Sequence, residues 1–244
     1  MNTISDTSAL IFAGSRGIGR ATALRLAREG ASVVVGYASN EAAAGKVVEQ
    51  IRALGGQAHA VRVDVADPQA VKAAFDEAIR HFDRVDVVVN AAAVSVFGPL
   101  GSLDPAAVRR ALDVNAMGAF HVLHEAAARV ADGGRIIHIS TGGTKMPIAG
   151  GGVYAGAKAA GEHMALGLAK ELGSRGVTVN VVSPGATDTD GLVMPKEQVE
   201  QLVAQTPLGR LGKPEDIADA IALLASPDAR WVNGQNLGVN GGIL

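Results

Sequence analysis

The chain of 244 residues contains no cysteine, which excludes disulfide bonds, thiol catalysis and zinc–thiolate sites. Aromatic residues are also scarce and make up only 3% of the sequence. No apolar run approaches the ~18 residues that a membrane-spanning helix needs. The first residues lack the basic and apolar segments of a secretory signal peptide. We therefore expect a cytoplasmic protein that is not embedded in a membrane.

An excess of charge of either sign is absent as well. The chain has 22 lysines and arginines against 24 aspartates and glutamates, and its net charge is −2 with neutral histidines. This balance gives no general electrostatic reason to bind nucleic acid or an anionic membrane surface. Hydrophobic residues nevertheless make up 48% of the chain. A chain that is rich in apolar residues but poor in aromatic ones indicates a sheet whose two faces are both buried by small side chains.

Apolar runs alternate with helical patterns along the whole chain. The predicted strands are 8–13, 31–37, 57–63, 85–90, 134–140, 177–182 and 235–239, and the predicted helices are 17–29, 41–54, 68–82, 104–130, 152–175 and 214–225. This alternation predicts an α/β Rossmann fold, a doubly wound parallel sheet of seven strands with helices on both faces. No linker or repeat divides the chain, so a single domain over 1–244 is expected. The least regular stretch, 186–213, is predicted to form a flap on the substrate side.

A glycine-rich turn follows the first predicted strand, which is where a dinucleotide-binding fold holds its pyrophosphate. Glycines let the backbone approach a phosphate, and the free N–H groups of the next helix carry partial positive charge. An ordinary turn is the alternative, but this position in the fold favours phosphate binding. The predicted contacts are Gly14, Ser15, Arg16, Gly17, Ile18 and Gly19.

The second predicted strand ends at Tyr37, and Ser39 and Asn40 follow it closely. An NAD site usually has an acidic residue here for the ribose 2′-hydroxyl, and none occurs before Glu41. A carboxylate would repel a 2′-phosphate, whereas hydroxyl and amide groups and the nearby cation Arg16 can bind it. The sequence therefore favours NADP(H) over NAD(H), with Tyr37, Ser39 and Asn40 as cofactor contacts. The alternative is an exposed Arg16 beside an ordinary turn.

Further candidate cofactor contacts lie at the carboxyl ends of later strands, which meet at one edge of a parallel sheet. Asp64 is either an adenine contact or the N-cap of the next helix, although Asp67 before Pro68 suits the cap better. Small residues after the fourth strand would let a flat cofactor pass across the strand tip. The candidates are Asp64, Val65, Asn90, Ala91, Ala92, Pro184, Gly185, Thr187 and Thr189.

Tyr154 and Lys158 lie four residues apart near the start of the predicted helix 152–175, so their side chains share one face. A free phenol titrates near pH ~10, and a cation within ~4–6 Å lowers that value. The pair is therefore a candidate proton donor for a carbonyl oxygen. The spacing alone is a weak motif, and its position after the fifth strand gives it weight because that strand ends at the same edge.

Two other polar features have simpler alternatives. Asn115 stands inside the apolar pattern 104–130, where it is either a functional group or a core amide bonded to the backbone. His121 and His124 are spaced i, i+3 beside Glu125, but no third ligand stands at a suitable distance in the sequence. No metal site is therefore predicted.

Together these residues resemble the short-chain dehydrogenase/reductase family over nearly the full chain. The resemblance rests on the turn 14–19, Asp64-Val65, Asn90, Asn115, Thr141, the pair Tyr154/Lys158, Pro184-Gly185 and Asn240-Gly241-Gly242. The most similar subgroup is that of the NADPH-dependent ketoreductases, which includes 3-oxoacyl-carrier-protein reductases and polyhydroxynaphthalene reductases. The resemblance implies hydride transfer between NADP(H) and a ketone or secondary alcohol, a small-molecule substrate.

The resemblance also implies roles for individual residues. Tyr154 would be the general acid, and Lys158 would lower the pKa of Tyr154 and hold the nicotinamide ribose. Asn115 would support a water for proton relay, and the hydroxyl of Thr141 would contact the substrate. A homotetramer packed through the helices near 104–130 and 152–175 is implied too. The nicotinamide would be flanked by Pro184, Gly185, Thr187 and Thr189.

Three positions depart from the family pattern. Thr141 stands where the family usually has a serine, and Ser140 is beside it; only one of the two hydroxyls can face the substrate, and spacing favours Thr141. Ala13 replaces the first glycine of the turn, which costs little if its φ is negative and strains the turn if φ is positive. One amide is missing after the fourth strand, in Asn90-Ala91-Ala92-Ala93.

A cofactor-binding regulatory module without turnover is the alternative class, motivated by Ala13 and Thr141. The intact set of Tyr154, Lys158 and Asn115 speaks against it, since a sensor has no need of a tuned acid. The sequence does not identify the substrate. An apolar pocket, or alternatively loop packing on the core, is predicted for Val94, Val96, Phe97, Met146, Ile148, Leu192, Val193 and Met194.

Overall fold

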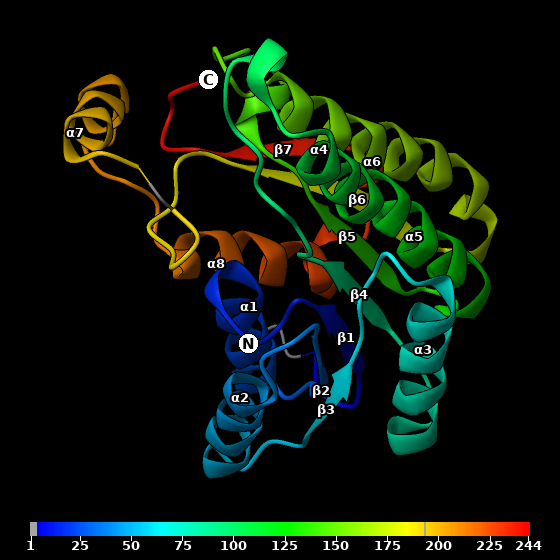
Figure 1. Ribbon diagram of the computed structural model, residues 1–244. Helices are drawn as coiled ribbons and strands as arrows, with labels where there is room; N and C mark the ends of the chain where they lie inside the picture. The colour runs from blue at the N-terminus through cyan, green and yellow to red at the C-terminus, as the bar shows by residue number, and fades with distance from the viewer. Residues whose placement is uncertain (1–3, 193) are drawn as a thin grey trace.

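The computed structural model of the chain describes residues 4–192 and 194–244. Residues 1–3 and Val193, which was predicted to line a pocket, lie outside that description. The described residues form a seven-stranded parallel sheet in the order β3-β2-β1-β4-β5-β6-β7 with helices on both faces (Figure 1). The predicted fold class is confirmed.

The strands match the predicted ranges closely. Their bounds are Ser8–Phe12 (β1), Ser32–Tyr37 (β2), Ala58–Arg62 (β3), Val87–Asn90 (β4), Arg135–Ile139 (β5), Thr178–Pro184 (β6) and Asn236–Val239 (β7). The main difference is β6, which was predicted to end at 182 but continues to pair with β7 as far as Pro184. Pro184 lacks an N–H, and it is tolerated because the pairing of β6 with β5 already ends at Val182.

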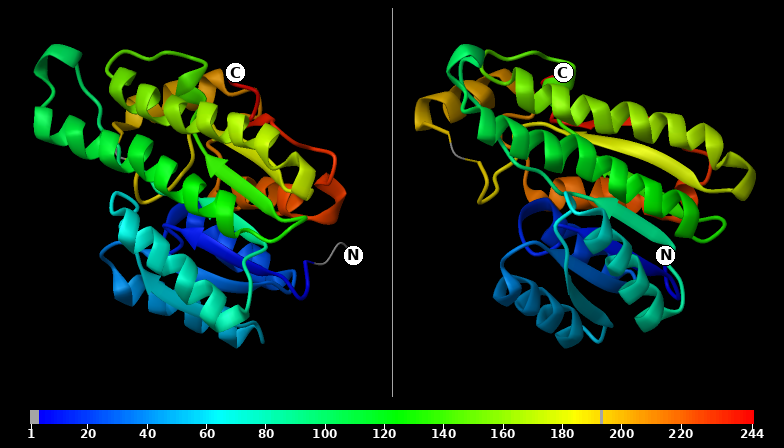
Figure 2. Two further views of the ribbon diagram at one scale, coloured as in Figure 1. Left: turned by 90° about the vertical axis from the view of Figure 1, so that its right-hand side faces the viewer. Right: turned by 45° about the vertical axis from the view of Figure 1, so that its right-hand side comes forward.

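The helices cover the sheet in two layers. Their bounds are Gly17–Arg28 (α1), Glu41–Ala53 (α2), Pro68–Phe82 (α3), Pro105–Leu112 (α4), Gly118–Arg129 (α5), Gly152–Glu171 (α6), Lys196–Gln205 (α7) and Pro214–Ala225 (α8). Helices α1, α2 and α8 pack on one face, and α3, α5 and α6 pack on the other (Figure 2). No helix among the described residues has both the length and the hydropathy to cross a bilayer.

Two apolar layers follow from the alternation of side chains along each strand. In β1, Ile11 faces the layer under α1, α2 and α8, while Leu10 and Phe12 face the layer under α3, α5 and α6. In β2, Val33 and Val35 face the first of these layers and Val34 the second. Strands covered on both faces have no solvated side, so nearly every residue in them is apolar.

Two predicted regions differ from the structure. The pattern 104–130 is not one regular helix, because a π-helical turn, Asp113–Met117, separates α4 from α5. The stretch 186–213 contains α7, a helix with no buried residue. The segment after Pro195 is rich in glutamate, glutamine and lysine, which favour a helix. Its apolar residues Val199, Leu202 and Val203 have helical spacing but are only partly buried. Figure 1 shows α7 standing apart from the sheet.

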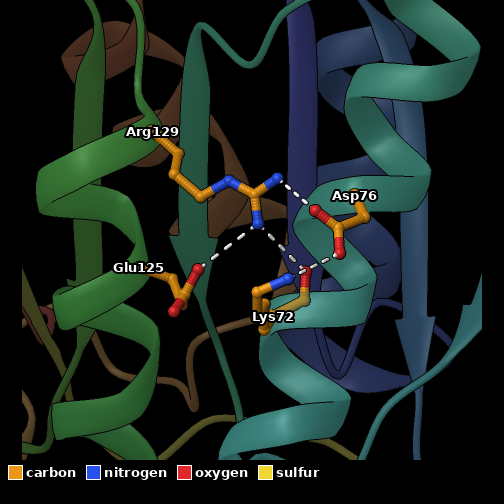
Figure 3. Close-up of polar contacts among 4 residues, drawn as sticks. All are labelled: Lys72, Asp76, Glu125 and Arg129. Atoms are coloured by element: carbon orange, nitrogen blue, oxygen red, sulfur yellow. Dashed lines mark hydrogen bonds and ion pairs between the residues drawn. The ribbon is translucent and has the colours of Figure 1, made fainter.

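An arginine joins α3 to α5 on the outer surface (Figure 3). The Arg129 guanidinium pairs with the carboxylate of Asp76 and lies 3.3 Å from Glu125 Oε2. It also donates to the carbonyl oxygen of Lys72 at 3.2 Å, and it lies 5.6 Å from the centre of the Phe75 ring. These contacts stabilise the packing of α3 on α5.

Candidate active site

A cleft of about 760 Å³ opens at the carboxyl edge of the strands. Nine of the predicted cofactor contacts line it: Ser15, Arg16, Gly17, Ser39, Asn40, Asp64, Val65, Ala92 and Thr189. Nine further residues that sequence analysis did not single out also line it: Arg20, Ala43, Val63, Arg110, Val114, Asp188, Asp190, Pro214 and Glu215. The structure thus brings turns from five separate parts of the chain to one cavity.

The glycine turn between β1 and α1 makes a close backbone approach that requires a glycine. A Cβ added to Gly19 would lie 2.1 Å from the carbonyl oxygen of Ala13, so no side chain fits there. Gly17 has a φ of 50°. No side chain caps the first turn of α1, which leaves its N–H groups for a ligand. The turn therefore fits a phosphate group.

Ala13 has a positive φ, which is the strained one of the two conformations considered for this position from the sequence. Its φ is 57°, in the left-handed region where a Cβ approaches the following carbonyl oxygen. Such a conformation costs roughly 1–2 kcal/mol for a residue with a side chain. The turn keeps its close approach to Gly19 in spite of this strain.

The end of β2 gives the cleft a corner with hydrogen-bond donors and one cation. Arg16, Ser39 and Asn40 all line it. Asn40 Oδ1 accepts a hydrogen bond from the Ala43 N–H at 2.9 Å as the N-cap of α2, so the side-chain NH₂ group remains a donor. Among the described residues, Arg16 makes no side-chain hydrogen bond or ion pair. The corner fits an anionic group such as a 2′-phosphate.

Asp64 lies on the cleft wall and is held there by Arg110, a contact that sequence reasoning missed. Its carboxylate accepts from Arg110 at 2.7 Å and from the Ala66 N–H at 3.0 Å. Burial acts to raise the pKa of Asp64, but these hydrogen bonds outweigh it and the pKa lies below its ordinary value. The N-cap of α3 is Asp67, as the sequence indicated, with Pro68 at the first helical position.

Other predicted cofactor contacts lie behind the cleft wall. Tyr37 is 8% exposed and belongs to the apolar layer under α1 and α2. Asn90 is buried, and its Oδ1 accepts from the Ala92 N–H at 3.2 Å. Thr187 is buried and donates to the Gly185 carbonyl oxygen at 3.0 Å. The other predicted contacts that do not line the cleft are Gly14, Ile18, Gly19, Ala91, Tyr154, Lys158, Pro184 and Gly185.

Asn115 sits in the π-helical turn and is fully buried. Its Oδ1 accepts from the Val94 N–H at 2.9 Å, and its Nδ2 donates to the Val94 carbonyl oxygen at 2.8 Å. The side chain therefore holds the loop after β4, which is the simpler of the two interpretations of this residue.

Tyr154 and Lys158 occupy the first two turns of α6. The Tyr154 ring lies 5.3 Å from the Phe97 ring, and Lys158 is only 1% exposed. Burial raises the pKa of Tyr154 above its ordinary value, which is the opposite of the lowering expected from Lys158. Burial also lowers the pKa of Lys158 to about 8, although Glu162 acts in the opposite direction. Burial thus favours the neutral form of both groups.

The two adjacent hydroxyls after β5 have different partners. Ser140 Oγ donates to Glu162 Oε1 at 2.5 Å, and the Thr144 hydroxyl donates to the same atom at 2.7 Å. Thr141 Oγ1 accepts from the Gly143 N–H at 3.2 Å, which leaves its own O–H free to donate. The Ser140 hydroxyl therefore bonds to a side chain of α6. Sequence reasoning missed Glu162, since nothing in the sequence relates it to Ser140.

His138 lies beneath Lys158 and sets how closely α6 approaches the sheet. It is fully buried, and its Nδ1 is 3.4 Å from Nδ2 of Asn90. Burial, and then the charge of Lys158, hold the pKa of His138 well below its ordinary value, so the ring is neutral. A Cβ on Gly161 would lie 2.4 Å from His138 Nε2. The glycine is therefore required where α6 crosses this ring.

Two loops beside Tyr154 carry several of the predicted pocket residues. The Gly98 N–H donates to the Gly150 carbonyl oxygen at 3.0 Å, which joins the loop after β4 to the loop before α6. Phe97 and Ile148 on these loops are 55% and 49% exposed. The arrangement presents apolar side chains at the mouth of the site near Tyr154.

The known proteins that are similar to this chain are described as dehydrogenases or reductases. A family model described as enoyl-(acyl carrier protein) reductase matches residues 12–244. Versicolorin reductase 1 from Aspergillus parasiticus is 39% identical over an alignment of 248 positions. The alignment covers 96% of this chain and 95% of that protein. A short chain dehydrogenase from Burkholderia cenocepacia, solved in complex with NADP, is 37% identical with a TM-score of 0.95, and covers 99% of each chain. The angucycline C-6 ketoreductase LanV, solved with bound NADP, is 36% identical with a TM-score of 0.94, and the match covers 100% of this chain and 97% of that one.

Proposed function

The chain belongs to the short-chain dehydrogenase/reductase family, and we propose that it is an NADPH-dependent ketoreductase. As a member of this family it is an oxidoreductase that interconverts a carbonyl group and an alcohol. The observation that carries the proposal is the position of Tyr154. It lies in the first turn of α6, which packs against the turn 142–144, and Thr141 with its free O–H directly precedes that turn. Two hydroxyl donors from neighbouring segments would therefore bind the carbonyl oxygen.

NADP(H) is the proposed cofactor. Two of the similar proteins contain bound NADP, and the cleft has a cation and neutral donors at the end of β2. Arg16, Ser39 and Asn40 would hold the 2′-phosphate, and the first turn of α1 would hold the pyrophosphate. Asp64 and Val65 would contact the adenine. The nicotinamide would be flanked by Pro184, Gly185, Thr187 and Thr189, as expected from the sequence.

The proposed mechanism assigns the proton chemistry to residues of the chain. When bound, the nicotinamide supplies the hydride or accepts it. The phenol of Tyr154 is protonated at neutral pH even at its ordinary pKa, and burial raises that pKa further, so in the reductive direction it has a proton to give to the carbonyl oxygen. The Thr141 hydroxyl donates a second hydrogen bond to that oxygen and stabilises its developing charge. Lys158 would hold the nicotinamide ribose, and Asn115 would support the water that replaces the proton.

The proposed substrate class is an apolar ketone. Phe97, which packs on Tyr154, and Ile148 expose apolar surface at the mouth of the site. No cation lies on these loops except Lys145, whose ammonium group lies 3.5 Å from the Asn236 carbonyl oxygen. An apolar ring system would gain from burial against this surface, whereas an anionic substrate would find little to pair with.

Three further properties are part of the proposal. The chain forms a single domain over 1–244, and 186–213, including α7, acts as a flap on the substrate side. The protein is a homotetramer that packs through α4, α5 and α6. Exposed apolar side chains on that surface support this assembly: Leu112, Met117 and Phe120 are 41%, 48% and 44% exposed. Sedimentation of the purified protein measures the assembly directly.

A panel of ketones tests the function. NADPH oxidation, followed at the absorbance band of the reduced nicotinamide, is expected with cyclic and aryl ketones and much less with small charged keto acids. NADH serves as the matched control for the cofactor and is expected to be the poorer donor. Tight binding of NADPH without oxidation by any ketone would contradict the proposal and favour a regulatory module instead.

A further inference from the structure

Three potential metal ligands gather on the surface at the β3 edge of the sheet, away from the cleft. His59 comes from β3, and Glu77 and His81 come from α3. Each offers one ligand atom, and these atoms all lie within 4.8 Å of one another. Glu77 Oε2 lies 3.7 Å from His59 Nε2 and 3.5 Å from His81 Nε2. No other group of three such residues is this close among residues 4–192 and 194–244.

The backbone holds these side chains together without help from an ion. Glu77 and His81 are four residues apart on α3, so they share one face of the helix. α3 packs beside β3, and the two imidazole rings stack with their centres 3.8 Å apart. The three side chains are 33%, 35% and 30% exposed, so an ion from solvent can reach them.

We propose that His59, Glu77 and His81 bind a divalent transition-metal ion, with Zn²⁺ as the reference ion. Two imidazole nitrogens and one carboxylate oxygen suit Zn²⁺, Ni²⁺ and Cu²⁺. With metal–ligand bonds of ~2.0–2.2 Å, neighbouring ligands of a tetrahedral ion lie ~3.4 Å apart. The two separations that involve Glu77, 3.5 Å and 3.7 Å, are within a few tenths of an ångström of that value, and all three ligand atoms lie within 4.8 Å of one another. The open side faces water, which completes the coordination.

Arg80 competes with a metal for two of these ligands. Its guanidinium pairs with Glu77 Oε2 and lies 3.0 Å from His81 Nε2. Arg80 is 62% exposed, so its side chain is free to turn into solvent when an ion displaces it. Arg52, whose guanidinium donates to the Ala58 carbonyl oxygen at 3.1 Å, adds a second positive charge nearby. The structure thus assigns Arg80 the role of an intrinsic competitor that weakens metal binding.

The bound ion would cross-link the edge strand β3 to α3. β3 pairs with β2 on one side only, so its other edge depends on such side-chain contacts. None of the three ligands lines the cleft. Metal binding therefore stabilises the folded chain independently of the proposed reaction, and the two proposals fail or succeed separately.

Thermal unfolding and calorimetry with tag-free protein and Zn²⁺ alone test the site. At Zn²⁺ concentrations about a hundredfold above Kd, the midpoint of unfolding should rise by about 5–10 °C. Mg²⁺ is the control ion and should give no shift, because it prefers oxygen ligands. The expected heat of Zn²⁺ binding corresponds to one ion per chain.

Variants distinguish this site from non-specific binding. His81→Ala and Glu77→Gln should each weaken Zn²⁺ binding by at least ~10-fold, since loss of even an outer partner of a metal ligand has that effect. The matched control is His124→Ala, which removes an exposed histidine on α5. This variant should bind Zn²⁺ as tightly as the unsubstituted chain does. Arg80→Ala should strengthen binding. Absence of a Zn²⁺-dependent shift, or equal binding by His81→Ala and the unsubstituted chain, would overturn the proposal.

Discussion

Ser140 Oγ lies 2.5 Å from Glu162 Oε1, and this hydrogen bond ties the end of β5 to α6. Glu162 is one turn beyond Lys158 on the same helix, so the bond fixes the segment that carries the proposed catalytic pair, Tyr154 and Lys158. The neighbouring Thr141 uses its oxygen to accept from Gly143 and keeps its proton for another acceptor. Of the two adjacent hydroxyls, Ser140 donates to a buried carboxylate and Thr141 keeps a free O–H.

This difference predicts opposite effects for two alanine substitutions. Thr141→Ala should lower kcat by ~10²-fold or more, because it removes a donor to the developing oxyanion, and should cost ~0.5–1 kcal/mol of stability through the lost hydrogen bond with the Gly143 N–H. Ser140→Ala should lower the free energy of unfolding by ~1–3 kcal/mol, because the buried Glu162 carboxylate loses a partner. Its effect on kcat should be smaller than that of Thr141→Ala. Thr141→Ser keeps the hydroxyl and is the matched control. A larger loss of kcat in Ser140→Ala than in Thr141→Ala would reverse the assignment.

Cofactor preference should respond to a single charge at the end of β2. Asn40→Asp keeps the N-cap of α2, since aspartate caps as well as asparagine, but it places a carboxylate on the cleft wall. Repulsion of the 2′-phosphate should raise KM for NADPH by ~10-fold or more, which corresponds to ~1.4 kcal/mol, while KM for NADH changes little. Asn40→Ser retains the cap without the charge and should keep the preference. Equal effects on both cofactors would show that Asn40 does not face a 2′-phosphate.

The strained turn predicts that a glycine at position 13 stabilises the protein. Ala13→Gly relieves a left-handed residue, which is worth ~1–2 kcal/mol, against ~0.4–1 kcal/mol of added entropy in the unfolded chain. The net gain should be ~0.5–1 kcal/mol, measured by denaturant unfolding. The control is Ala107→Gly on the exposed surface of α4, which should lose ~0.5–1 kcal/mol because glycine disfavours a helix. A loss at both positions would contradict the positive φ of Ala13.

The buried ammonium group predicts an unusual dependence of stability on pH. The pKa of Lys158 falls from 10.5 to about 8 in the folded chain, which at 1.36 kcal/mol per unit is worth about 3 kcal/mol. Between these values the unfolded chain binds the proton and the folded chain does not. This residue therefore destabilises the folded chain fully below pH 8, and the cost disappears as pH rises towards 10.5.

Lys158→Met isolates this contribution. The variant should be more stable than the unsubstituted chain at pH 7, and the difference should shrink as pH rises from 8 towards 10.5, measured by denaturant unfolding at each pH. The comparison uses protein without added cofactor. A difference that stays constant across this range would mean that Lys158 titrates at its ordinary pKa when folded.

The fold could be predicted because its signals are local. The apolar runs around Leu10, Val34 and Val88 indicate buried parallel strands, and Gly17 and Gly19 after the first of them indicate the turn into α1. Each of these depends on neighbours in the sequence. The helix α7 was missed although Val199, Leu202 and Val203 have helical spacing, because the glycines and prolines of the surrounding stretch 186–213 indicated an irregular segment.

The candidate site was only partly predictable, because its side chains depend on partners distant in the sequence. Asp64 is held by Arg110, and Ser140 by Glu162, and neither spacing forms a recognisable motif. The effect of burial on Tyr154 was also missed. The sequence places Lys158 one turn from the phenol, but it does not reveal that burial raises the pKa of Tyr154 or that the Phe97 ring lies 5.3 Å from the Tyr154 ring.

The most direct test of the account is the activity of Tyr154→Phe, measured together with its affinity for NADPH. Loss of the phenolic hydroxyl removes the proton donor but keeps the ring that packs on Phe97. We predict that reduction of the best ketone falls by ~10²–10⁴-fold while NADPH binding, measured by titration, is nearly unchanged. Full turnover by this variant would contradict the central claim that Tyr154 is the general acid.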